Sequence, residues 1–407
     1  MHCCRKLTRK GQANEKKHCR DDKPKLDDAE VLRRAQATLE KHLPLEADGY
    51  CCNSETLYQV LIGVGVKKGT IESVCAELAD APDGETIRGY LNEQLRVEDL
   101  PRLERQINAA LAANWPKKLR RGGPVEVAMD FHDRPYYGKS EQAKGLWVRG
   151  KAKDGTTRFY RVATAYAIVH GQRLTLGIHF VLPKEETVEV LADLWRGLRQ
   201  RALRISCLYL DKGFASVAVF DYLHRRQQPA LIACPIRGKK GGARALCKGN
   251  KSYRAEHTFK SGSGELFRAQ MSVCRVFTTA KRTGRHKREA TWLLFVQIHL
   301  DWAPERCRQR YRKRFGIETS YRLTNKLLGR TTSPNPALRF VLMGLGFVLL
   351  NLWVHLCWEF TQVARRGGRM LKTALFRQQR FINFLIRALE RLYGYVSEIT
   401  APSVPLL

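Results

Sequence analysis

Acidic residues are scarce in this chain of 407 residues. Asp and Glu total 39 against 72 Lys and Arg, which gives a formal net charge of +33. Self-repulsion at this charge opposes compaction unless a polyanion neutralises it. The balance therefore favours nucleic acid as a partner, with an anionic membrane surface as the second choice. Hydrophobic residues make up 44% of the chain, which excludes a wholly disordered protein.

Cysteine is also sparse, because 12 residues are too few for a disulfide scaffold of this length. No apolar stretch follows the basic N-terminus, so we expect no signal peptide and reduced thiols in a cytoplasmic compartment. The sequence lacks a P-loop and a dinucleotide-binding fingerprint. A cluster near the N-terminus could bind zinc, but its spacing matches no standard finger; it contains His2, Cys3, Cys4, His18 and Cys19. We favour a basic segment without metal, with zinc as the alternative.

Long hydrophobic runs are absent with one exception. Residues 340–358 contain no Lys, Arg, Asp or Glu over 19 positions, which meets the length rule for a membrane-spanning helix. The run stands alone, and Asn351 and His355 interrupt it with polar side chains. A helix that is apolar all round is also typical of the core of a large domain, and we favour this buried helix.

Helical periodicity dominates the first part of the chain. Residues 1–26 carry nine Lys or Arg and are predicted to form a basic tail. Region 27–118 follows, with helices expected at 70–78 and 85–95 around a short turn. This outline is typical of a helix-turn-helix, although a plain helical bundle produces the same pattern. We therefore predict a helical DNA-binding domain over 27–118, with Arg88 on its second helix as a DNA contact.

Strand patterns begin after a linker at 116–124. We expect a mixed α/β core in two parts, 119–236 and 291–360, separated by a β-rich insertion at 237–290 and followed by a basic helical region at 361–407. The turn His170-Gly171 joins two of the strands into a hairpin. The strands are expected at 125–131, 157–168, 172–182, 205–210, 230–234 and 291–299, and the helices at 185–203, 217–226 and 304–328.

Three acidic residues stand out by their placement in this pattern. Asp130 and Asp211 end two of the strands, and Glu318 lies in the Arg-rich helix. Carboxylates that converge from two neighbouring strands and a facing helix form an all-oxygen site suited to a pair of divalent cations. For each residue taken alone, a capping or solvent-facing acid is the alternative. The element order and the basic chain favour the metal site.

The motifs around these acids resemble those of a known family. Asp130 lies in DFHDRPYYGK, Asp211 in LYLDKGF, and Glu318 ends the pattern Tyr311-x2-Arg314-x3-Glu318. In this order, over about residues 124–358, they resemble the DDE transposases of bacterial and archaeal insertion sequences, in the group with a Tyr-Arg-Glu-Lys signature. The resemblance implies an α/β fold: an RNase H-like mixed sheet with flanking helices and a β-rich insertion.

The signature Lys is displaced in this chain. Its position, seven residues after the Glu, holds Asn325, and Lys326 follows one residue later. On a helix this displacement is a rotation of about 100°. The resemblance implies that Lys326, Tyr311 and Arg314 contact the DNA backbone, where the Arg fork suits a phosphate. It also implies a tryptophan that stacks a flipped base; Trp292 is the candidate, with a core tryptophan as the alternative.

The family's activity follows from the same resemblance. It implies a DNA transposase that cuts element ends and joins their 3′-hydroxyls to target DNA by two-metal phosphoryl transfer. Asp130, Asp211 and Glu318 are the implied ligands of two Mg²⁺ ions, with Mn²⁺ as a substitute. The expected partners are double-stranded DNA, as terminal inverted repeats and target, and a second copy of the chain; we expect no membrane. We expect a prokaryotic, cytoplasmic, nucleoid-associated protein. The alternatives are an RNase H-like nuclease without strand transfer and a non-catalytic DNA-binding derivative.

Overall fold

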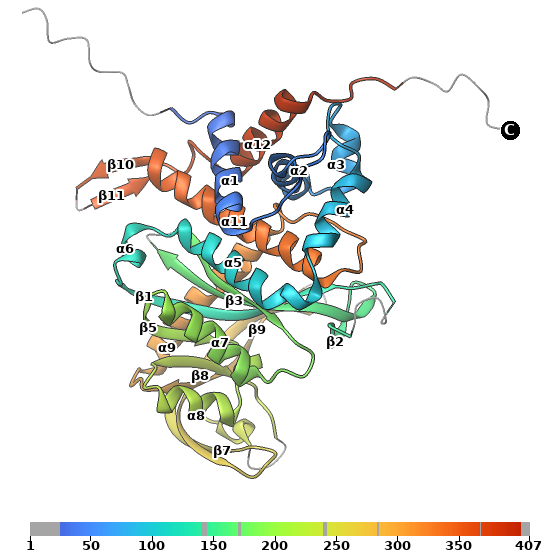
Figure 1. Cartoon of the computed structure of the whole chain (residues 1–407). Helices are drawn as coiled ribbons and strands as arrows, with labels where there is room; N and C mark the ends of the chain where they lie inside the picture. The colour runs from blue at the N-terminus through green and yellow to red at the C-terminus, as the bar shows by residue number, and fades with distance from the viewer. Residues whose placement is uncertain are drawn as a thin grey trace, which may run out of the picture.

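The computed structural model describes residues 25–139, 145–169, 172–238, 242–282, 285–366 and 368–399. The predicted basic tail, except residues 25 and 26, lies outside the described residues, and so do the N-terminal Cys and His residues and the His170-Gly171 turn. The described chain forms a layer of helices above a large mixed sheet (Figure 1).

Side-chain caps determine where several N-terminal helices begin. Asp27 accepts a hydrogen bond from Glu30 N at the start of the first helix, and Thr70 and Ser73 form a reciprocal capping box at the third. The helices predicted at 70–78 and 85–95 are present as the third and fourth. The N-terminal elements are α1 (Asp28–His42), α2 (Ser54–Lys67), α3 (Ile71–Glu77), α4 (Gly84–Gln94), η1 (Val97–Asp99), α5 (Leu100–Ala113) and α6 (Lys117–Arg120).

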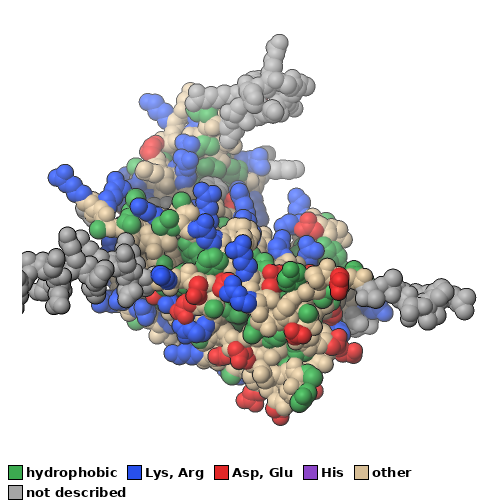
Figure 2. Space-filling model, turned by 90° about the horizontal axis from the view of Figure 1, so that it is seen from above, with side chains coloured by type: hydrophobic (Ala, Val, Ile, Leu, Met, Phe, Trp, Pro, Cys, Tyr) green, Lys and Arg blue, Asp and Glu red, His purple; other side chains and the backbone are tan. Residues whose placement is uncertain are grey.

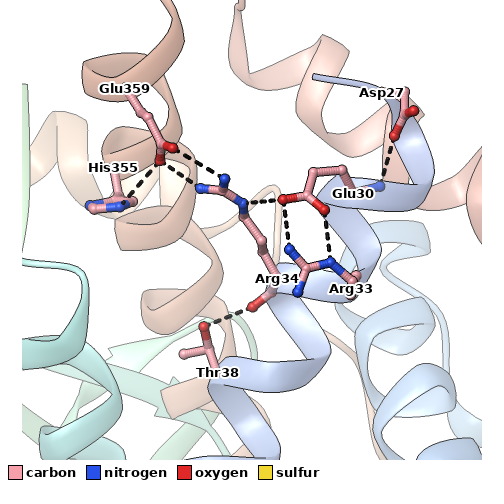
Figure 3. A network of polar contacts seen from close by, with 7 residues as sticks. All are labelled: Asp27, Glu30, Arg33, Arg34, Thr38, His355 and Glu359. Atoms are coloured by element: carbon pink, nitrogen blue, oxygen red, sulfur yellow. Dashed lines mark hydrogen bonds and ion pairs between the residues drawn. The ribbon is translucent and has the colours of Figure 1, made fainter. Parts of the chain in front are cut away.

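The two ends of the chain share this helical layer. The last helix, α12 (Gln378–Tyr393), packs against α1 and α2, as Figure 1 shows. A polar network joins α1 to α11 (Pro336–Phe360), because Arg34 donates to Glu30 at 2.6 Å and to Glu359 at 2.5 Å (Figure 3). Figure 2 shows the outer face of the layer, where many Lys and Arg side chains lie among fewer Asp and Glu.

Nine strands form one sheet in the order β2-β3-β1-β5-β6-β9-β8-β7, with β4 paired to β3. Helices α7 (Thr187–Gln200) and α8 (Val217–Arg225) connect its strands and lie in front of it in Figure 1. The strands are β1 (Pro124–Pro135), β2 (Val148–Lys153), β3 (Thr156–Val169), β4 (Gln172–Val181), β5 (Arg204–Leu210), β6 (Ala230–Cys234), β7 (Tyr253–Lys260), β8 (Leu266–Arg282) and β9 (Arg285–Ile298).

The strand order β4-β3-β1-β5-β6 is that of the predicted RNase H-like sheet. The predicted hairpin is the antiparallel pair β3 and β4, and β3 is also antiparallel to β1. Parallel pairing of β1 with β5 and of β5 with β6 follows from the helical crossovers, which return each strand in the same direction. The predicted α/β class with flanking helices is confirmed.

Strands β7 to β9 extend this sheet. Strand β9 pairs antiparallel with β6, and β8 and β7 follow outward. The predicted boundary at 290/291 therefore lies inside β9, because one continuous strand serves both the sheet edge and the long hairpin. The short 3₁₀ helix η4 (Ala243–Leu246) precedes β7.

Helix α11 is long and apolar enough to cross a membrane, but 94% of its most apolar window is buried inside the structure. It packs against α5 and β4. The amide of Asn351 is fully buried and joins the three elements, since it donates to Thr175 O at 2.8 Å and to Leu111 O at 3.3 Å and accepts from Thr175 N. After it, β10 (Gln362–Arg365) and β11 (Gly368–Leu371) form a small hairpin. The chain thus uses this run as a core helix, as predicted.

Candidate active site

Asp130 and Asp211 lie side by side because the strands that carry them are parallel neighbours. Met129 on β1 pairs with Leu210 on β5, and each aspartate is the next residue. Side chains alternate between sheet faces, so both carboxylates point away from the face on which Met129 and Leu210 join the main core. Asp211 also precedes the 3₁₀ helix η3 (Lys212–Phe214). The structure therefore brings the two predicted aspartates together on one face.

Arg314 lies between the two carboxylates. Its Nη2 atom is 2.8 Å from Asp130 Oδ2 and 3.5 Å from Asp211 Oδ1. The arginine side chain is 8% exposed, against 16% for Asp130 and 40% for Asp211. One buried cation thus balances two acids that repel each other.

The segment that carries Arg314 is fastened to the same sheet face by polar anchors. Arg310, on α9 (Pro304–Tyr311), donates to Glu126 on β1 at 2.9 Å. The hydroxyl of Tyr311 donates to Leu210 O at 3.1 Å, directly before Asp211. The 3₁₀ helix η5 (Arg312–Phe315) follows and carries Arg314 over the sheet. Tyr311 is buried, so in this DNA-free structure it positions the end of β5; its contact with DNA stays a prediction.

The environment of Asp130 favours its protonated form. Burial raises the pKa of Asp130 to about 6; the Arg314 guanidinium opposes this rise and Asp211 adds to it. Asp130 Oδ1 also accepts a hydrogen bond from Phe131 N at 3.0 Å. Carboxylate oxygens that converge on one cationic group are the donor set that hard divalent cations prefer. The residues present therefore fit a divalent cation.

Glu318 lies on α10 (Gly316–Thr324), four residues after Arg314. Its side chain is exposed and, within the described part of the chain, makes no hydrogen bond or ion pair. Sequence reasoning missed Tyr321, one helical turn further on. The Tyr321 hydroxyl is 2.6 Å from Thr164 Oγ1 on β3 and 3.5 Å from Asp130 O. Tyr321 thus holds α10 over β3 and β1, next to Asp130. Its i+3 spacing from Glu318, which places both residues on one face of the helix, was the sequence signal that could have identified it.

The remaining predicted DNA contacts lie on elements other than the strands that carry the aspartates. Lys326 is exposed beyond the end of α10. Arg88 on α4 forms an ion pair with Glu72 on α3 at 2.7 Å. Trp292 on β9 is partly buried and packs on the main core with the alternate residues Leu294 and Val296. It therefore lies on the opposite sheet face from Asp130, as a core tryptophan.

A second cluster of potential ligands is formed by His179, Glu185 and Asp193. His179 is bonded at both ring nitrogens, with Nδ1 3.0 Å from Glu104 and Nε2 2.7 Å from Glu185. Burial alone would lower the pKa of His179, but these carboxylates outweigh it and raise the pKa to about 10. A protonated imidazole has no lone pair to offer a metal. We therefore interpret this cluster as a structural ion network.

An RNase H-like sheet that presents paired aspartates, with a glutamate on a helix anchored to the same sheet, defines a class of carboxylate-dependent enzymes. The family described as "Transposase DDE domain" matches residues 121–352, which is more than half of the chain. The chain belongs to this family, the DDE transposases, and is an enzyme of that kind. Membership implies the use of divalent metal ions.

Comparison with solved structures agrees with the fold. The chain is similar to the piggyBac transposase in a cryo-EM structure of its synaptic complex with hairpin DNA, with a TM-score of 0.51 and 9% identity. The likeness covers 93% of this chain and 80% of that one. At this identity it shows the fold alone. A search of curated protein sequences finds no match.

Proposed function

We propose that this transposase cuts the ends of a mobile DNA element and joins the 3′-hydroxyls to target DNA at one site, built from Asp130, Asp211 and Glu318. The observation that carries the proposal is the meeting of Asp130 and Asp211 around the Arg314 guanidinium on two parallel strands. Asp211 follows the end of β5, whereas Asp130 lies within β1, which continues to Pro135 and does not end at Asp130 as predicted. The family match over the same residues supports it.

Asp130, Asp211 and Glu318 would hold two Mg²⁺ ions, with Mn²⁺ as a substitute. When bound, such a pair lowers the pKa of a nucleophilic water and stabilises the leaving oxygen of an in-line displacement. Asp130 and Asp211 are held by backbone pairing of rigid strands, which keeps their oxygens in place. Glu318 is free of internal partners among the described residues and on a separately anchored helix, so it is available to complete the ligand set.

If divalent cations neutralise Asp130 and Asp211, the Arg314 guanidinium becomes free to pair with a phosphate. Its planar fork matches a phosphate, so we infer that it turns from the aspartates to the scissile strand. We propose that Lys326 and Tyr311 contact the DNA backbone nearby, that Arg88 contacts the duplex from α4, and that Trp292 serves DNA only where a strand reaches the opposite face of the sheet. The net charge of +33 supports strong binding of this polyanion.

Joining two ends together requires that both be held at once. We therefore propose a homodimer or larger assembly on paired terminal inverted repeats, acting at the nucleoid in a prokaryotic cytoplasm. The similar piggyBac transposase was solved as a synaptic complex with hairpin DNA, which supports paired DNA ends as the substrate. The proposed assembly involves no membrane.

The test is cleavage and joining of candidate element ends in vitro with Mg²⁺ or Mn²⁺. Asp211→Asn and Glu318→Gln are compared with Asp221→Asn, a control whose side chain on α8 is 39% exposed, close to the 40% of Asp211. We expect metal-dependent products from the wild type and the control and none from the two site variants. Cleavage without joining would identify a nuclease instead, and site variants as active as the control would make the carboxylates structural.

A further inference from the structure

A cavity of about 610 Å³ lies beside the active site and takes no part in the chemistry proposed above. It opens between the end of β1, the turn from β2 to β3 and the segment that joins α10 to α11. Its volume is within the range of pockets that hold small organic ligands. Among the described residues that line it, three are arginines, Arg134, Arg330 and Arg339, and one is acidic, Asp154.

Arg134 is the unusual member of this lining. Its side chain is half-buried on β1, and within the described chain its guanidinium makes no hydrogen bond or ion pair. Burial lowers the pKa of Arg134, and the neighbouring Arg339 lowers it further. A withdrawn cation next to a second cation is costly unless an anion joins them. Arg134 is therefore placed to pair with an anionic ligand that enters the cavity.

Arg339 shapes the wall of the cavity. Its Nε donates to Ser333 O at 2.6 Å and its Nη2 to Thr331 O at 3.2 Å. Its guanidinium also lies over the rings of Tyr136 and Tyr160, at 5.2 Å and 5.6 Å from their centroids. These contacts fix the segment that follows α10 and leave Arg134 and Arg330 to meet a ligand.

The cavity is aligned with the active site. Asp130 and Arg134 are four residues apart on one strand and share a face, which places them about 13 Å apart. The lining segment is also tied to the ends of the α3–α4 pair, because Arg330 N donates to Gly69 O at 2.8 Å and Asn335 donates to Leu95 O at 2.9 Å. Between them on the same face, His132 packs against Tyr321 of α10 and Phe347 of α11, with ring centroids 4.6 Å and 6.5 Å apart, so a DNA strand would reach the cavity around α10 and not along β1.

The recess of Arg134 restricts which part of DNA reaches it. Duplex phosphates lie on a convex surface and meet exposed side chains, whereas a half-buried guanidinium is open only to a strand end or an extruded nucleotide. At the mouth of the cavity, the Tyr137 side chain is 68% exposed, and its hydroxyl is held by Asp154 O at 2.7 Å. An exposed, fixed aromatic ring beside basic groups is a platform on which a base stacks.

We propose that this cavity binds one nucleotide of an unpaired DNA strand, with its phosphate on Arg134 and Arg330 and its base against Tyr137. The proposal rests on the proposed function, because the strand is the one that leaves the duplex next to Asp130 and Asp211. It adds a binding site on the side of the aspartates that faces α11, distinct from the predicted contacts at Tyr311, Lys326 and Trp292.

The test compares two fluorescent probes in EDTA, a blunt duplex and the same duplex with a short 5′-phosphorylated single-stranded overhang. We expect the wild type to bind the overhang probe about tenfold more tightly, the value of a hydrogen-bonded charge pair. Arg134→Gln should remove this preference and Arg134→Lys should retain part of it. The matched control is Arg225→Gln, whose exposed side chain pairs with Asp221 on α8, away from the cavity. An equal preference in Arg134→Gln, or none in the wild type, overturns the proposal.

A second measurement separates this site from the proposed function. Calorimetric titration of the whole chain with thymidine 5′-monophosphate, thymidine and inorganic phosphate needs neither cleavage nor a duplex. We expect the nucleotide to bind the wild type more tightly than either fragment, and Arg134→Gln to bind all three equally. A chain that binds no DNA but still shows this pattern would refute the proposed function and keep the pocket; binding that is unchanged in Arg134→Gln would refute the pocket.

Discussion

Replacing Arg314 by Ala should both weaken the metal-free fold and make it respond more strongly to divalent cations. In the structure, one guanidinium balances Asp130 and Asp211, from 2.8 Å and 3.5 Å. Without it, two carboxylates on adjacent strands face each other with no cation between them. The variant therefore measures how much the Arg314 charge stabilises the two aspartates when no metal is bound.

The magnitude follows from the exposure of each partner. Removing one member of a buried ion pair costs about 3–5 kcal/mol. Asp211 is 40% exposed, so water screens part of its charge, and Asp130 takes up a proton as its pKa rises further. We therefore expect a loss of about 2–4 kcal/mol in the free energy of unfolding at pH 7. An acid whose folded pKa is raised destabilises the fold as pH rises through that pKa, so the loss should be smaller at pH 5 than at pH 8.

The assay is urea denaturation in EDTA and in Mg²⁺, for the wild type, Arg314→Ala and the exposed-pair control Arg225→Ala. Mg²⁺ should stabilise Arg314→Ala more than the wild type, by about 1.4 kcal/mol for each tenfold gain in affinity once the ion is in excess. The control should lose only about 0.3–0.5 kcal/mol and show no added response. Equal stability of Arg314→Ala and the control in EDTA would refute the view that Arg314 neutralises the two aspartates.

Three further outcomes test other parts of the structure. In urea denaturation, His179→Gln should lower the free energy of unfolding most near pH 6 and progressively less toward pH 10. A folded pKa raised above the unfolded value stabilises the fold below about pH 6.5, and this stabilisation is lost as pH rises through about 10. Asn351→Leu should lower the free energy of unfolding by about 2–3 kcal/mol, since it strands the backbone groups of Thr175, while the exposed helix residue Asn383, changed to Leu, serves as a nearly neutral control. Tyr311→Phe should slow DNA cleavage with unchanged DNA affinity if its hydroxyl positions β5 through Leu210 O; a loss of affinity in a binding titration would make it a DNA contact instead.

The central sheet could be predicted because its local signals agree with its topology. The β3–β4 hairpin shows a turn between two β-branched runs, and β5 and β6 are short apolar runs separated by an amphipathic helix. Asp130 and Asp211 each end such a run. Once the two strands are parallel neighbours with Met129 opposite Leu210, the next residues, Asp130 and Asp211, meet on one face, although β1 continues past Asp130 to Pro135. The aspartate pair therefore follows from the order of elements together with this register.

The role of Arg314 could not be predicted in this way. The pattern Tyr311-x2-Arg314-x3-Glu318 indicated two DNA contacts, Tyr311 and Arg314, and a metal ligand, Glu318, but it held no information on which of them the protein itself would use. The ion pair depends on how α9 settles on the sheet, and that depends on anchors such as Arg310 to Glu126, 184 residues apart in sequence. Such long-range contacts leave no local period, so periodicity identified the helix but not its internal partners.

Trp292 shows that the face of a strand on which a residue lies is also hard to predict from sequence. The run TWLLFVQI is apolar at nearly every position, so alternation along it does not reveal which residues face the helices and which face the active site. Pairing with β6 settles this, because Leu294 and Val296 enter the main core while Phe295 packs beside Tyr311 on the other face. Trp292 has the parity of Leu294, and a shift of one residue would turn it toward Asp130. Any base that stacks on Trp292 must therefore come from DNA that passes around the sheet edge, whereas Arg134 lies on the same strand and the same face as Asp130.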